Sequence, residues 1–95
     1  MTIENRTALI TGGSRGIGKA IATALGFAGW NVAVNYASSA AAAQETVEHI
    51  AARGGQAHAI RADIGNRLDR QLLITETVEH FGKLDLLELE EVFLL

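Results

Sequence analysis

Short apolar runs alternate with longer stretches of helical periodicity along this 95-residue chain. The apolar runs predict strands at residues 7–10, 31–35 and 56–62, and a fourth that begins at Leu84. The periodic stretches between them predict helices at residues 17–28, about 39–53 and 66–81. Glycine follows each of these stretches, as is common where a helix ends. The pattern therefore predicts the order β-α-β-α-β-α-β.

Apolar positions mark the face that each predicted helix is expected to bury. They are Ile17, Ile21, Ala24, Leu25 and Ala28 in the first helix, Ala43, Val47, Ile50 and Ala51 in the second, and Leu68, Leu72, Thr75 and Val78 in the third, with Ile74 and Phe81 flanking. Ser38 or Ser39 is expected to cap the second helix, and Asn66 the third. Gly26 weakens the first helix by about 1 kcal/mol relative to alanine, so we expect close packing to require it.

Strands separated by helical crossovers predict an α/β fold with a parallel sheet and helices on its faces. With right-handed crossovers and the 3-2-1-4 strand order of doubly wound nucleotide-binding folds, two helices cover one face and the third helix covers the other. The run at 56–62 is less apolar than the others, which favours an edge position. We therefore expect a truncated Rossmann fold of about four strands and three crossover helices, forming a single domain over residues 1–95.

Composition excludes several classes of function. The net charge of −3, from 8 Lys and Arg against 11 Asp and Glu, gives no basic surface for nucleic acid. The chain has no cysteine, so it forms no disulfide or thiolate metal site, and we expect a cytoplasmic location. Residues 1–6 have no signal-peptide pattern, and no apolar run approaches the ~20 residues that cross a bilayer. The chain's three histidines fall on two helices and a strand, with no two on one helical turn, which does not favour a metal site.

The most informative segment is Thr-Gly-Gly-Ser-Arg-Gly-Ile-Gly at residues 11–18, between the first strand and the first helix. A helix N-terminus presents unpaired N–H groups and a partial positive charge, and glycines let a phosphate approach the backbone. Simple turn glycines are one alternative. A mononucleotide P-loop is another, because Gly13 to Lys19 fits its first seven positions, but Ala20 lacks the hydroxyl that binds Mg²⁺. The remaining interpretation is a dinucleotide site.

The spacing T-G-x-x-x-G-x-G in this segment resembles the cofactor motif of the short-chain dehydrogenase/reductase family. Residues 31–39 are similar to the second strand and turn of that family, Ala62-Asp63-Ile64 to the end of its third strand, and residues 81–87 to the approach to its fourth. The resemblance runs from about residue 5 to 87 and is nearest to the 3-oxoacyl-(acyl-carrier-protein) reductase type. It implies hydride transfer between a nicotinamide dinucleotide and a ketone or alcohol.

The resemblance also implies roles for individual residues. Gly12, Gly16 and Gly18 would shape a pyrophosphate cradle to which Ser14 and Ile17 add contacts, while Asp63 would meet the adenine and Ile64 would pack near it. A turn or helix-capping role is the alternative for Asp63. Tyr36 would line the adenosine pocket or serve only as a strand former. These roles describe the cofactor half of an oxidoreductase.

The region after the second strand indicates which nicotinamide cofactor is preferred. Residues 34–39 contain no carboxylate, the group that binds the ribose 2′-hydroxyl in NAD-preferring enzymes. Arg15 can make a charge-assisted bond to a 2′-phosphate, and Ser38 can donate a hydroxyl to it. A solvated Arg15 and a capping Ser38 are the alternatives. We therefore expect NADP(H) in preference to NAD(H).

The resemblance ends within the fourth strand, and residues 88–95 diverge. The catalytic Ser, the Tyr-x-x-x-Lys pair and the active-site Asn of the family are not found, since Ala40 stands four residues after Tyr36, the single tyrosine. We expect no turnover by this chain alone, with a non-catalytic nucleotide-binding or interaction module, or an inactive gene remnant, as the alternative. An incomplete sheet exposes apolar surface and a strand edge, so we also expect self-association.

Overall fold

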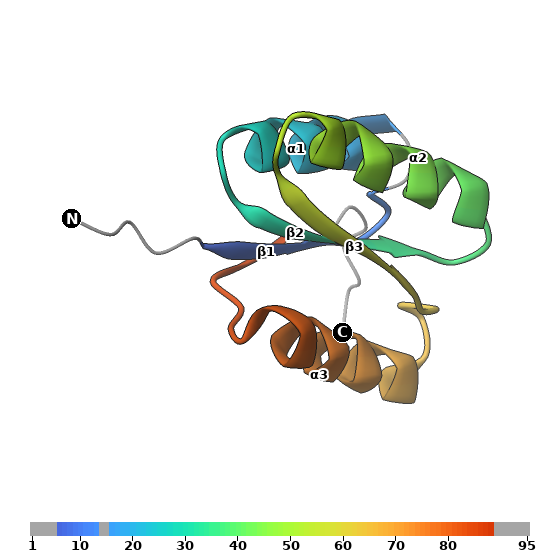
Figure 1. The fold of residues 1–95 in the computed structure, drawn as a ribbon. Helices are drawn as coiled ribbons and strands as arrows, with labels where there is room; N and C mark the ends of the chain where they lie inside the picture. Colours follow the sequence, from blue (N-terminus) through green and yellow to red (C-terminus); the bar gives the residue numbers. More distant parts are fainter. Residues whose placement is uncertain (1–5, 14–15, 89–95) are drawn as a thin grey trace.

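Four parallel strands form the centre of the protein in a computed structural model that describes residues 6–13 and 16–88 (Figure 1). The elements in chain order are β1 (Thr7–Ile10), α1 (Gly16–Phe27), β2 (Asn31–Tyr36), α2 (Ala40–Ala52), β3 (Gln56–Arg61), α3 (Arg67–Phe81) and β4 (Leu86–Glu88). The strand order is β3-β2-β1-β4. The predicted order of elements and the predicted sheet order are both confirmed, with the third strand at an edge.

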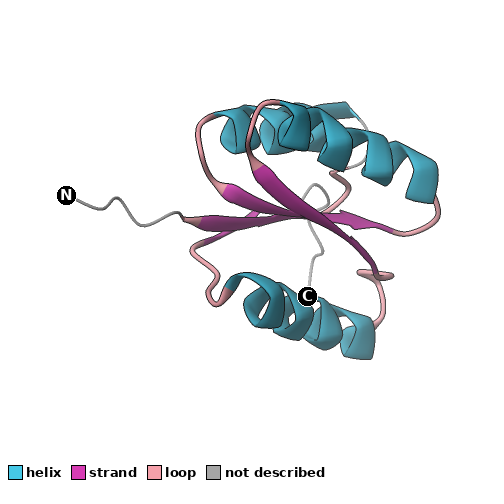
Figure 2. Ribbon diagram, in the orientation of Figure 1, coloured by secondary structure: helices cyan, strands magenta, loops and turns pink. Residues whose placement is uncertain are grey.

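Helices cover both faces of the sheet, with α1 and α2 on one face and α3 on the other (Figures 1 and 2). Successive residues of a strand point to opposite faces, so β1 and β2 contribute to two apolar layers. Ile10 and Val34 pack under α1 and α2, whereas Leu9 and Ala33 belong to the layer with Leu73 of α3. Strands buried on both faces explain why these runs are continuously apolar. No helix within residues 6–13 and 16–88 is long and apolar enough to span a bilayer.

α1 packs closely on α2 at Gly26, as predicted. A Cβ atom at Gly26 would lie 2.6 Å from Cγ2 of Ile50 on α2. The buried row of α1 consists of small residues, Gly18, Ala22 and Gly26. The prediction that Ile17, Ala24 and Ala28 face the core was wrong, because all three are exposed, while Ile21 and Leu25 are partly buried beside the row of small residues.

The predicted apolar face of α3 was also wrong. The buried residues are Leu73 and Thr77, while Leu68 and Leu72 are 67% and 64% exposed. Thr77 can be buried because its hydroxyl donates to the Leu73 carbonyl at 2.8 Å. Thr75 was predicted to lie on the buried face of α3, but Thr75 is exposed and Thr77 is buried. In α2 the Thr46 hydroxyl likewise donates to the Ala42 carbonyl at 3.1 Å, and Thr46 is buried. The prediction that Ala51 faces the core was wrong, because Ala51 is exposed.

The helix ends follow the predicted signals in part. Asn66 caps α3, its Oδ1 accepting a hydrogen bond from the Asp69 N–H at 3.1 Å. Gly82 ends the helix in the left-handed conformation. Ser39, not Ser38, occupies the N-cap position of α2, and its side chain makes no capping hydrogen bond there. Ser38 therefore lies outside the N-cap position, and the side-chain cap predicted for the start of α2 is not observed at Ser39.

Candidate functional site

The carboxyl ends of parallel strands lie at one edge of a sheet, and the candidate site residues follow the ends of β1, β2 and β3. Hydrogen bonds join these three segments. The Gly13 N–H donates to the Asn35 carbonyl at 3.2 Å, and the Ala62 N–H donates to the Tyr36 carbonyl at 2.9 Å. The glycine loop, the end of β2 and the residues after β3 therefore form one continuous edge at the carboxyl ends of the strands, where open α/β sheets bind their ligands.

The glycine loop has a conformation that side chains would prevent. Gly12 has φ of 66° and Gly16 has φ of 57°, in the left-handed region that favours glycine. A Cβ atom at Gly18 would lie 2.5 Å from the Gly12 carbonyl oxygen, so α1 can pack on the loop only without a side chain there. The three glycines thus have the turn and packing roles that a dinucleotide loop requires, and the residues fit such a cofactor.

Two of the predicted cofactor residues, Ser14 and Arg15, lie outside the described residues, so their roles stay predictions. Ile17 lies in the first turn of α1 and is 73% exposed. Its side chain is not packed in the core, so it is accessible to a ligand at the helix N-terminus. The cofactor contact predicted for Ile17 stays a prediction.

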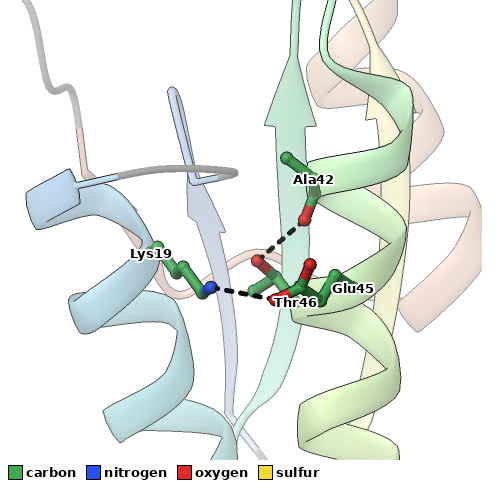
Figure 3. Close-up of polar contacts among 4 residues, drawn as sticks. All are labelled: Lys19, Ala42, Glu45 and Thr46. Atoms are coloured by element: carbon green, nitrogen blue, oxygen red, sulfur yellow. Dashed lines mark hydrogen bonds and ion pairs between the residues drawn. The ribbon is translucent and has the colours of Figure 1, made fainter.

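Lys19 argues against the P-loop alternative. A P-loop lysine reaches toward the phosphates, but the Nζ of Lys19 lies 3.5 Å from Oε1 of Glu45 on α2. Figure 3 shows this ion pair crossing from α1 to α2, beside the Thr46–Ala42 hydrogen bond. Ala20, which stands where a P-loop has a hydroxyl, is exposed. The loop therefore has the glycine geometry of a phosphate site without the P-loop lysine arrangement.

Tyr36 and Ser38 stand at and after the end of β2. Tyr36 is half-buried and packs against the apolar layer under α1 and α2. Ser38 is exposed in the turn before α2, where its hydroxyl is accessible to a ligand. The backbone of this turn is tied to β3 by the Arg61 Nε–H, which donates to the Ala37 carbonyl at 3.4 Å. Structurally, Ser38 is available for the phosphate role predicted for it.

Asp63 and Ile64 follow β3 directly. Oδ1 of Asp63 accepts a hydrogen bond from the Gly65 N–H at 2.9 Å, so the carboxylate does form the turn considered as its alternative role. The Asp63 N–H donates to Oδ2 of Asp69 at 2.8 Å, which fixes the backbone. Ile64 is half-buried and lines a hollow of about 70 Å³ together with Thr11 and Leu87. The turn fixes Asp63 at the edge of the sheet, an arrangement compatible with an adenine contact.

Sequence reasoning missed two residues that position this site. Thr11 binds the loop to β4, since its N–H and its hydroxyl both donate to the Glu88 carbonyl, at 3.0 and 3.2 Å. Asn35 is a buried polar residue in an apolar strand, with side-chain bonds to the end of β3. The signal for both was available, because a polar residue within or directly after a buried strand needs a hydrogen-bonding partner.

The fold also brings together two histidines that the sequence analysis treated as separate. The rings of His58 on β3 and His80 on α3 stack in parallel with centroids 3.9 Å apart, and Phe81 meets His80 edge-on. Oε1 of Glu76 lies 3.7 Å from Nε2 of His58. Partial burial and the neighbouring His58 lower the pKa of His80, and Glu76 opposes this effect.

Within residues 6–13 and 16–88, no group of three or more acidic, histidine or cysteine side chains could hold a metal ion.

Comparison with known proteins adds independent findings. Residues 6–89 match the family model described as short chain dehydrogenase. The chain is 51% identical over 84 residues to versicolorin reductase 1 of Aspergillus parasiticus, a match that covers 88% of this chain and 32% of that protein. It is 49% identical over 86 residues to a hydroxynaphthalene reductase of Aspergillus fumigatus, covering 90% and 32%.

Solved structures agree with the fold. A dehydrogenase/reductase from Sinorhizobium meliloti superimposes with a TM-score of 0.89 at 45% identity, covering 94% of this chain and 35% of that one. A short-chain dehydrogenase from Burkholderia cenocepacia, solved in complex with NADP, gives 0.84 at 45% identity, covering 86% and 34%. The chain therefore spans about a third of the length of these proteins. None of the relatives described above is named as an acyl-carrier-protein reductase, so this subtype is not supported.

Proposed function

Because the chain belongs to the short-chain dehydrogenase family, we propose that it binds NADP(H) as the cofactor half of an oxidoreductase acting on ketones or alcohols. One observation carries the proposal. At the junction of β1 and α1, Gly12 and Gly16 adopt left-handed φ values, and a Cβ at Gly18 would collide with the Gly12 carbonyl. Backbone N–H groups at the start of α1 are thus open to the diphosphate of a dinucleotide.

Each residue at this edge has a role in the proposal. Gly12, Gly16 and Gly18 shape the pyrophosphate cradle, to which Ser14 and Ile17 contribute contacts. Arg15 and Ser38 bind the 2′-phosphate, Tyr36 lines the adenosine pocket, and Asp63 and Ile64 contact the adenine. When bound, the nicotinamide supplies the hydride chemistry, and the work of this chain is to hold and orient the dinucleotide.

Preference for NADP(H) is supported by the absence of negatively charged side chains around the end of β2. Residues 34–39 hold no carboxylate that would repel a 2′-phosphate, and the hydroxyl of Ser38 is exposed there. The Burkholderia cenocepacia structure in complex with NADP is 45% identical to this chain, which favours the same cofactor.

The substrate class follows from the family and not from a pocket in this chain. The relatives named above are reductases of versicolorin and hydroxynaphthalene, and a ketone or alcohol substrate fits those names. The 95 residues hold one tyrosine, Tyr36, without a lysine four residues on. We therefore propose that the chain binds the cofactor but does not turn over substrate by itself. A non-catalytic nucleotide-binding module is the second candidate, and the same absence of a Tyr-x-x-x-Lys pair favours it.

Self-association is part of the proposal because the described surface carries clustered apolar side chains. Ile74 is exposed on α3 and Leu87 is exposed on β4, and the two side chains line one hollow between these elements. Apolar surface beside an edge strand favours contact with another chain. We propose that this other chain is a second copy of the same protein.

Calorimetric titration of the 95-residue chain with NADPH and with NADH tests the proposed function. We expect NADPH to bind more tightly than NADH, with no NADPH oxidation in the presence of simple ketones. Equal or tighter binding of NADH would contradict the cofactor preference, and binding of neither would contradict the proposed function. Measurable ketone-dependent oxidation would contradict the proposed lack of turnover.

A further inference from the structure

A buried amide lies at the end of β2, where the candidate cofactor site begins. The side chain of Asn35 is on the α3 side of the sheet, in the layer that includes Ala33 and Ile60, and the residue is only 2% exposed. A polar side chain in such an apolar layer lowers stability unless its polar atoms are hydrogen-bonded. The hydrogen-bonding partners of the Asn35 side chain therefore indicate its structural role.

The Asn35 amide donates to carbonyls at and just after the end of β3, and to the carbonyl of the next residue on β2. Nδ2 lies 3.1 Å from the Ala62 carbonyl, 3.3 Å from the Ile60 carbonyl and 3.4 Å from the Tyr36 carbonyl. The last register pair of the two strands is Tyr36 with Arg61, so the Ala62 carbonyl lies just beyond the paired strands. The side chain of Asn35 supplies a donor where β2 no longer offers one.

The main chain of the same residue holds the glycine loop. The Asn35 carbonyl accepts a hydrogen bond from the Gly13 N–H at 3.2 Å. Gly13 is itself closely packed, since a Cβ there would lie 3.2 Å from Cγ1 of Val34. Asn35 thus bonds the loop through its backbone and, through its side chain, the residue directly before Asp63.

We propose that Asn35 is a positioning residue that sets the spacing between the glycine loop and the Asp63–Ile64 segment, and through it the affinity for an adenine dinucleotide. This inference rests on the proposed function. Asn35 is too buried to touch the ligand, so it acts through Gly13 and Ala62. A dinucleotide contacts both segments at once and depends on their spacing, whereas inorganic pyrophosphate needs the loop alone.

The chain offers a matched control for the loss of a buried amide. Asn31 lies on the same strand, is 8% exposed and donates from Nδ2 to the Thr7 hydroxyl at 3.3 Å. It stands at the start of β2, away from the glycine loop. Asn35→Leu and Asn31→Leu therefore remove similar groups from the two ends of one strand.

The experiment measures NADPH affinity by calorimetry, pyrophosphate affinity by NMR titration, and the melting temperature of the wild type and both variants. For Asn35→Leu we expect NADPH affinity to fall about tenfold and pyrophosphate affinity to stay within about twofold of wild type. For Asn31→Leu we expect a lower melting temperature with both affinities within about twofold of wild type. Asn35→Thr keeps one donor and is expected to lie between wild type and Asn35→Leu.

Equal NADPH affinities for the two leucine variants would overturn the inference, as would a parallel loss of NADPH and pyrophosphate affinity in Asn35→Leu. If Asn35→Leu does not fold, the comparison passes to Asn35→Thr and Asn31→Thr with the same criteria. Absence of NADPH binding by the wild type would overturn the proposed function itself, and is seen before any substitution is made. Wild-type binding with unaffected Asn35 variants would overturn only the role of Asn35.

Discussion

Gly18 in α1 faces the main chain of Gly12 so closely that a Cβ atom would lie 2.5 Å from the Gly12 carbonyl oxygen. A backbone carbonyl in a tight loop cannot rotate away as a side chain can. Gly18→Ala is therefore expected to displace the loop, to cost roughly 1–3 kcal/mol in the free energy of unfolding, and to abolish measurable NADPH binding. Urea denaturation and calorimetric titration measure the two effects.

Gly26→Ala is the control for this variant, because it too introduces a methyl group into a tight contact of α1. Its nearest atoms belong to the Ile50 side chain, which can shift. We expect a comparable loss of stability with unchanged NADPH affinity. Equal loss of NADPH affinity in both variants would mean that binding depends on general stability and not on the loop.

Arg15→Ala tests the proposed contact with the 2′-phosphate. Loss of a charge-assisted hydrogen bond is expected to weaken NADPH binding about 10- to 100-fold and to leave NADH binding unchanged. Arg67→Ala removes an equal charge from the exposed first turn of α3 and serves as the control. An unchanged NADPH affinity for Arg15→Ala, measured by competition with 2′,5′-ADP, would remove Arg15 from the site.

The stacked histidines predict a dependence of stability on pH. The pKa of His80 lies below its ordinary value of 6.5 because of partial burial and the neighbouring His58, against the opposing effect of Glu76. Between these two pKa values the unfolded chain binds more protons than the folded chain. The free energy of unfolding is therefore expected to fall as pH drops from about 6.5 through the lowered pKa.

Urea denaturation between pH 5 and 8 measures this effect. His80→Gln is expected to reduce the pH dependence, while His49→Gln, on the exposed side of α2, is expected to retain it. An unchanged slope in His80→Gln would assign the pH dependence to other groups.

Replacing apolar residues on the β4 side of α3 tests self-association. Ile74 and Leu87 line one hollow and are both exposed, so the double variant Ile74→Lys, Leu87→Lys is expected to shift the chain toward monomer in analytical ultracentrifugation. Leu68→Lys, at an exposed position of α3 outside this hollow, is the control and is expected to leave association unchanged. A monomeric wild type at high concentration would refute the proposal.

The order of elements could be predicted because its signals are local. Buried parallel strands are continuously apolar, Asn66 provides a capping side chain, and glycine ends each helix. The buried faces of the helices depend instead on how closely elements approach. Thr77 is buried because its hydroxyl bonds within the helix, and Gly26 because Ile50 lies against it, and neither contact is visible in periodicity.

The candidate site was predictable to the extent that it follows a motif. The glycines of residues 11–18 carry their own conformational requirement, which the φ values of Gly12 and Gly16 confirm. Long-range partners were not predictable in this way. The bonds of Asn35 to Ala62 and the stacking of His58 on His80 join residues more than twenty positions apart, and only the sheet register and the docking of α3 bring them together.

The central claim is that the glycine loop binds the diphosphate of NADP(H) through its backbone amides. A titration of ¹⁵N-labelled chain with NADP⁺, followed by NMR, tests it most directly. We predict that the largest amide shifts fall on Gly12, Gly13 and residues 16–18, with smaller shifts at Ser38 and Asp63. Saturating NADP⁺ that leaves the loop amides unmoved, or shifts confined to other parts of the chain, would contradict the account.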